Sequence, residues 1–101
     1  MGMANLQRMA MQMQQNLARL DQELAETRVE GSAGGGVVKA VVTGKQELVS
    51  VTIDPSAVDP SDVEMLQDLI VAAVTEAQRA AQELAATKTA AVTGGLKLPG
   101  M

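Results

Sequence analysis

Apolar residues recur every three or four positions over the first quarter of the chain, which is the period of one face of an α-helix. The repeating positions are Met3, Leu6, Ala10, Met13, Leu17, Leu20 and Leu24. A stripe of this kind, kept over three heptads, is typical of a helix that packs along another helix. Because residues 3–28 contain no Gly or Pro, we predict one long helix over this range.

The period changes to two in the middle of the chain, where β-branched residues alternate with polar ones between glycine turns. A first strand is predicted over residues 27–33, with turns at Gly34-Gly35-Gly36 and at Gly44-Lys45. The faces predicted to be buried are Val38, Ala40 and Val42 in a second strand, and Val49, Val51 and Ile53 in a third. Connections this short join antiparallel neighbours, so the pattern predicts a three-stranded antiparallel sheet.

A second helical pattern follows Asp54-Pro55, which ends the third strand. Its apolar positions are Val63, Leu66, Ile70, Ala73, Ala77, Ala80 and Leu84. Ser61 and Glu64 stand three residues apart, as in a capping box, and predict a helix start at Ser61. Asp59, Asp62, Glu64 and Asp68 crowd this end, where negative charge suits the helix dipole.

The apolar face of this second helix becomes rich in alanine after Val74, and we expect looser packing there because alanine buries little area. The helix is predicted to run to about Ala91, where Thr93-Gly94-Gly95 follows and stops it. Residues 92–101 are expected to form an extended tail.

The order of these elements predicts an α+β fold in a single domain, residues 1–101: a long N-terminal helix, a three-stranded antiparallel sheet and a long C-terminal helix. The chain contains no Phe, Tyr or Trp, and aromatic side chains normally bury the largest areas. A domain of about 100 residues without them has a marginal core. We therefore expect self-association, with the helices displayed as arms.

Composition removes whole classes of chemistry. The chain has no Cys and no His, which excludes disulfides, thiolate chemistry, Cys/His metal sites and imidazole catalysis. The glycines match no nucleotide-binding motif and the acidic residues match no calcium loop. We expect no enzyme, cofactor or metal. No apolar run approaches about 18 residues, so we expect a cytoplasmic protein without membrane contact.

The charge is distributed unevenly along the chain, although its net value of −4 alone opposes binding to nucleic acid. Residues 1–20 contain Arg8 and Arg19 and no acid, and residues 79–101 contain three basic residues against Glu83. The middle of the chain carries the acidic excess. Because the sheet joins the two helices, the basic ends are predicted to project from it, where Lys and Arg can contact phosphates without aromatic residues.

The ordered set of segments resembles the YbaB/EbfC family of bacterial nucleoid-associated proteins over nearly the whole chain. The segments are Asn5-Leu6-Gln7-Arg8 with the Gln/Met-rich helix after it, the hairpin from Gly31 to Val38, Val49 to Pro55, Glu64 to Ile70, and the ending Gly94 to Gly100. The resemblance implies a tweezer-shaped homodimer that binds double-stranded DNA through helical arms. It also implies a cytoplasmic protein that associates with the nucleoid and influences DNA organisation and gene expression.

The family's basic arm positions are matched here by four residues, so the resemblance implies DNA binding by Arg8, Arg19, Arg79 and Lys88. Family members often carry further Lys or Arg where this chain has Asn16, Ala80 and Ala86. We therefore expect modest, strongly salt-dependent affinity with little sequence preference. The alternative is a homodimeric protein-interaction module with little DNA affinity, which the acidic net charge and the apolar helix faces favour.

Overall fold

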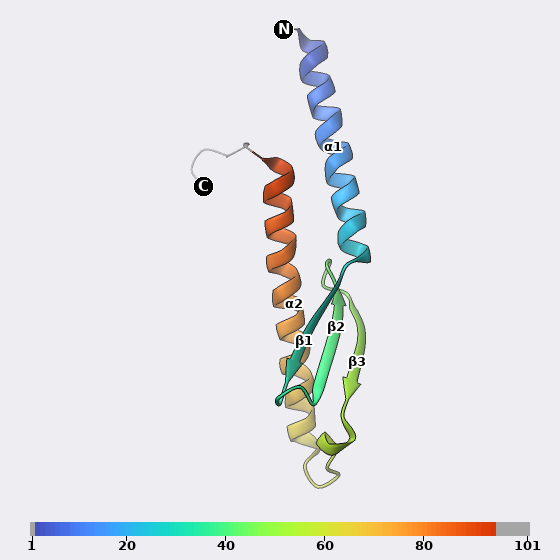
Figure 1. Ribbon diagram of the computed structural model, residues 1–101, viewed down its shortest axis with the longest axis vertical. Helices are drawn as coiled ribbons and strands as arrows, with labels where there is room; N and C mark the ends of the chain where they lie inside the picture. Colours follow the sequence, from blue (N-terminus) through green and yellow to red (C-terminus); the bar gives the residue numbers. More distant parts are fainter. Residues whose placement is uncertain (1, 95–101) are drawn as a thin grey trace.

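The computed structural model describes residues 2–94 and contains the predicted elements in the predicted order (Figure 1). They are α1 (Met3–Glu26), β1 (Arg28–Ala33), β2 (Val38–Thr43), β3 (Leu48–Ile53), the short 3-10 helix η1 (Pro55–Ala57) and α2 (Val63–Thr93). The strands pair antiparallel in the order β1-β2-β3. The α+β fold class and the three-stranded sheet are therefore confirmed.

Helix α2 is the spine of the molecule. The sheet packs along its N-terminal half, and α1 runs antiparallel beside its C-terminal half and extends past its end (Figure 1). The molecule measures 71 × 28 × 16 Å and its radius of gyration is 19.5 Å, against about 13 Å for a compact domain of this length. The fold is thus elongated, and much of its apolar surface lies outside its own core.

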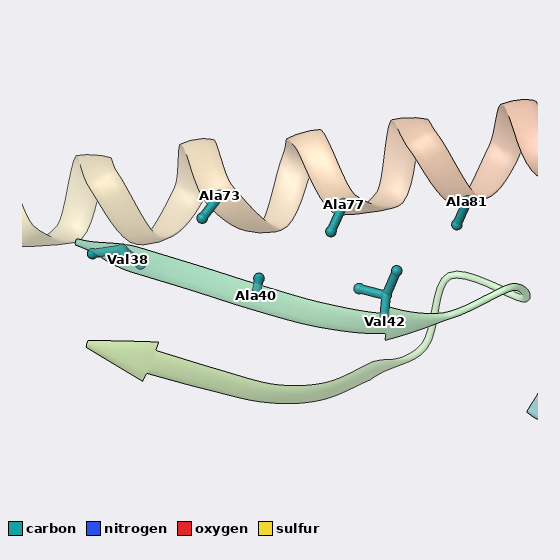
Figure 2. Packing of buried hydrophobic residues seen from close by; sticks show 6 residues of the cluster. All are labelled: Val38, Ala40, Val42, Ala73, Ala77 and Ala81. Atoms are coloured by element: carbon teal, nitrogen blue, oxygen red, sulfur yellow. The ribbon is translucent and has the colours of Figure 1, made fainter. Parts of the chain in front are cut away.

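The core lies between β2 and the middle of α2. Val38, Ala40 and Val42 of β2 point at a row of alanines, Ala73, Ala77 and Ala81, and all six side chains are fully buried (Figure 2). The expectation of loose packing after Val74 is therefore wrong for Ala77 and Ala81, whereas residues 82–94 include no buried side chain. Small side chains let the helix approach the sheet closely, and each alanine is surrounded on all sides.

Gly31 of β1 permits this close approach. A Cβ atom at Gly31 would lie 2.5 Å from the carbonyl oxygen of Ala73 and would overlap the backbone of Ala77. Any side chain here would push α2 away from the sheet. The glycine of this strand is therefore needed for helix–sheet contact, and its role does not depend on a special backbone conformation.

Strand β3 is only partly covered. Val51 and Ile53 are half-buried, but Leu48 is 53% and Val49 is 49% exposed. Val49 was predicted to be buried. It is not, because α2 packs on β1 and β2, and because the β2–β3 register shifts between Val41 and Val42. Within residues 2–94, the N-terminal end of this edge strand, at Leu48 and Val49, is thus left largely exposed.

The start of α2 differs from the predicted capping box. The N-cap is Asp62, whose Oδ1 accepts a hydrogen bond from the backbone N–H of Met65 at 3.1 Å. Ser61 instead belongs to the preceding turn, where its hydroxyl and its N–H both donate to Oδ1 of Asp59, at 2.7 and 2.9 Å. The helix therefore begins one residue later than predicted.

The far end of α2 lies at Thr93, two residues beyond the predicted end, and Gly94 follows as the C-cap with a φ of 57°. The expected extended tail was placed at residues 92–101. Its first two residues are helical, and residues 95–101 lie outside the part that the structure describes.

The apolar stripe of α1 is buried at one end only. Leu20 and Leu24 pack into the protein, whereas Met3 is 75% and Leu6 is 68% exposed. Among residues 2–94, the N-terminal part of α1 has no partner helix, since it extends past the end of α2 (Figure 1).

Candidate nucleic-acid interface

The N-terminal part of α1, residues 3–19, forms a free arm. It carries Arg8 and Arg19, both exposed, and the first acidic residue of the helix is Asp21. Among residues 2–94, the one ion pair joins Lys45 Nζ and Asp21 Oδ1 at 3.2 Å. Within that range, both arginines of the arm therefore face solvent without a carboxylate partner.

Helix geometry places these two arginines on one face. Arg8 and Arg19 are eleven residues apart, which at about 100° per residue is an offset of only about 20°. Their Cα atoms are separated by about 16 Å along the axis, from a rise of 1.5 Å per residue. Two positive charges on one face of a projecting helix can contact two phosphates of one duplex.

The other two predicted residues do not share a face. Arg79 and Lys88 are nine residues apart in α2, an offset of about 180°. Arg79 is exposed, with Glu76 and Glu83 within one turn on either side. Lys88 is half-buried on the stripe that also carries the buried Ala81. The structure thus brings Arg8 and Arg19 together and separates Arg79 from Lys88, which the residue spacing alone already indicates.

A shallow cavity of about 290 Å³ lies at the base of the arm, where α1 meets the end of α2. It is lined by Asn16, Arg19, Leu20, Glu23, Ala91 and Val92. One positive and one negative side chain contribute to its lining, so it has no strong preference for an ion of either sign. Its significance is positional, because it shows that Arg19 sits where the free arm joins the rest of the molecule.

The titratable groups with shifted pKa values are structural. The backbone N–H of Ser56, followed by its side chain, lowers the pKa of Asp54, and the hydroxyl of Ser61, followed by its N–H, lowers that of Asp59. Both carboxylates are exposed and hold the turns between β3 and α2. Residues 2–94 contain no group of three or more acidic residues able to hold a metal ion. Neither long helix is apolar enough over that range to cross a membrane.

Comparison with known proteins gives a consistent result. The profile of the YbaB/EbfC DNA-binding family matches residues 1–96. A nucleoid-associated protein of Moorella thermoacetica is 56% identical, with 99% of each chain covered. One of Saccharopolyspora erythraea is 54% identical, covering 99% of this chain and 97% of that one.

A solved structure shares the fold. The crystal structure of an uncharacterized protein from Helicobacter pylori superposes with a TM-score of 0.80 at 24% identity. It covers 93% of this chain and 99% of that one.

Proposed function

Because this chain belongs to the YbaB/EbfC DNA-binding family, we propose that it is a nucleoid-associated protein that binds double-stranded DNA as a homodimer. Binding is mainly through phosphate contacts from the helical arms, and it affects nucleoid organisation and gene expression in the bacterial cytoplasm. Relatives from several bacteria are named nucleoid-associated proteins, which supports this assignment.

The observation that carries the proposal is the free arm of α1. The chain as a whole is acidic, with a net charge of −4, yet residues 3–19 contain two exposed arginines and no acid. The arm also extends away from the acidic body (Figure 1). This separation lets the arm approach a duplex while the body stays at a distance, where salt screens its repulsion.

Arg8 and Arg19 are proposed as the main phosphate contacts, since they share a face of the arm. Arg79 contributes a weaker contact because acidic residues lie about one turn away on both sides of it, Glu76 and Glu83, whereas Arg19 has Glu23 on one side only. Lys88 is half-buried, and we propose that its ammonium group reaches a phosphate while its stem packs between the helices.

The homodimer is supported by the surfaces that the protomer leaves uncovered. Leu48, Val49 and Val71 are 53%, 49% and 65% exposed, and β3 is an edge strand whose N–H and C=O groups lack a neighbour on one side. Within residues 2–94, the largest fully buried side chains are those of two valines, Val38 and Val42. A second copy of the chain would cover β3 and add the apolar burial that one protomer lacks.

The test is fluorescence anisotropy of a labelled duplex of about 30 base pairs, titrated with the purified protein at low and near-physiological salt. We expect binding that weakens steeply as salt rises. Replacing Arg8, Arg19, Arg79 and Lys88 together with alanine should abolish binding while the dimer persists in light scattering. Unchanged binding by this variant would show that the assigned residues are wrong.

The second candidate, a protein-interaction module, is favoured by one specific observation. Met3, Leu6 and Met9 are 75%, 68% and 67% exposed on the arm, and such a face suits a partner helix. A pulldown that recovers the same proteins before and after nuclease treatment would support this function. Recovery that depends on nucleic acid would support DNA binding.

A further inference from the structure

Two glutamines lie between the arginines of the arm, on the same face. Arg8, Gln12, Gln15 and Arg19 follow one another at spacings of four, three and four residues, so they form one stripe along α1. We call this set the Arg–Gln stripe. All four residues are exposed, and the stripe faces away from the side on which Leu20 and Leu24 pack. Phosphate contact accounts for the arginines and leaves the glutamines unexplained.

Resting on the proposed DNA binding, we infer that the Arg–Gln stripe lies in the major groove and that Gln12 and Gln15 read adenine between two phosphate contacts. The major groove is about 12 Å wide and admits an α-helix, whereas the minor groove of about 6 Å does not. The arm extends past the end of α2 (Figure 1), and of the four stripe residues Arg19 alone lines the cavity that α1 forms with Ala91 and Val92. Because all four side chains are exposed, the duplex can reach the stripe.

The spacing along the helix fits the spacing of base pairs. Gln12 and Gln15 are three residues apart, or about 4.5 Å along the axis, close to the 3.4 Å that separates neighbouring base pairs. Arg8 and Arg19 span about 16 Å, which corresponds to about five base-pair steps. The two amides therefore reach adjacent base pairs near the centre of a site that the arginines bracket.

The amide chemistry selects the base. A glutamine side chain offers one acceptor and one donor group, which match the N6 amino group and N7 of adenine in a bidentate pair. No carboxylate precedes Asp21 in α1, so no side chain of the stripe repels the phosphates of the DNA backbone. The groove also selects duplex DNA over RNA, since the major groove of A-form RNA is too deep and narrow to be read. The two glutamines thus add a base preference to the phosphate contacts of the two arginines, which by themselves are non-specific.

The test is selection from a library of duplexes with a randomised centre, followed by anisotropy on the selected duplex and on a copy in which its A·T pairs are replaced by G·C. Three proteins are compared: the natural chain, Gln12→Ala/Gln15→Ala, and Gln7→Ala/Gln14→Ala. Gln7 and Gln14 are exposed residues of the same arm but lie more than a quarter turn from the stripe. Alanine favours the helix at all four positions, so folding is preserved.

We expect the natural chain to prefer the adenine-containing duplex by about tenfold or more. Gln12→Ala/Gln15→Ala should bind both duplexes equally with an unchanged salt dependence, and Gln7→Ala/Gln14→Ala should keep the preference. A preference that survives Gln12→Ala/Gln15→Ala overturns the inference, and so does equal binding of all duplexes by the natural chain. Failure to bind any duplex at low salt would overturn the proposed function as well.

Discussion

At the residue scale, the fold depends on a few positions where small size matters more than apolar area. Gly31 lies against the backbone of α2, and the fully buried alanines at 73, 77 and 81 form the opposite wall. Such contacts stabilise through close dispersion rather than through large transferred areas. Positions of this kind tolerate no added volume, which gives the first prediction.

Gly31→Ala should lower the free energy of unfolding by about 2–3 kcal/mol, because the new methyl group forces α2 off the sheet. The matched control is Gly35→Ala, whose Cβ would meet nothing within 4 Å but whose φ is +74°. That variant should lose only about 1 kcal/mol from backbone strain. Urea denaturation of both variants at one protein concentration measures the difference, and equal losses would contradict the role given to Gly31.

The acid side of the stability curve is set in part by Asp59. Hydrogen bonds from Ser61 keep the folded-state pKa of this carboxyl below its ordinary value of 3.8. Its contribution is therefore complete above pH 3.8 and is lost as the pH falls toward the lower folded pKa. The difference in urea midpoint between the natural chain and Asp59→Asn should shrink below about pH 4. A difference that stays constant with pH would contradict this.

At the scale of elements, period and turn residues predicted most of the fold. The strands and their turns follow from apolar positions that recur every second residue between Gly34-Gly35-Gly36 and Gly44-Lys45 and after them, because a period of two bounded by turn residues is typical of strands. The start of α2 was missed because Ser61 had a competing partner in Asp59. The exposed half of the α1 stripe could not be predicted, because a stripe shows that a face is apolar and not what covers it.

In the candidate site, too, some features were predictable from the sequence and others were not. The spacing of eleven residues in the sequence already predicts that Arg8 and Arg19 share a face of α1. The spacing of nine residues likewise predicts that Arg79 and Lys88 lie on opposite faces of α2. The projection of α1 beyond the end of α2 depends on how the sheet packs on α2 and where it places the end of α1. This arrangement is tertiary, and no local pattern encodes it.

The observed N-cap gives a prediction for α2. Asp62→Ala should destabilise the protein by about 1 kcal/mol, because the N–H of Met65 loses its acceptor. Glu64→Gln should change stability by only a few tenths of a kcal/mol. Thermal denaturation of the two variants compares their stabilities directly. A larger loss of stability in Glu64→Gln than in Asp62→Ala would contradict the Asp62 cap and favour the capping box of Ser61 and Glu64.

At the scale of the whole molecule, the elongated protomer is expected to be half of the functional unit. Light scattering coupled to gel filtration should give about twice the chain mass of 10.5 kDa. Val49→Asp places a charge on the uncovered face of β3 and should shift the protein toward the monomer. Thr52→Asp, on the opposite face of the same strand, should leave the dimer intact. A dimer insensitive to Val49→Asp would place the interface elsewhere.

The most direct test of the central claim is the slope of log affinity against log salt for duplex DNA, since each phosphate contact contributes about −0.9. Arg8→Ala/Arg19→Ala removes up to four contacts from a dimer and should flatten the slope by up to about 3.6. The matched control, Lys39→Ala/Lys45→Ala, removes the same charge from the sheet and its turn and should leave the slope almost unchanged. The reverse result, a slope that depends on the sheet lysines and not on Arg8 and Arg19, would contradict DNA binding by the free arm.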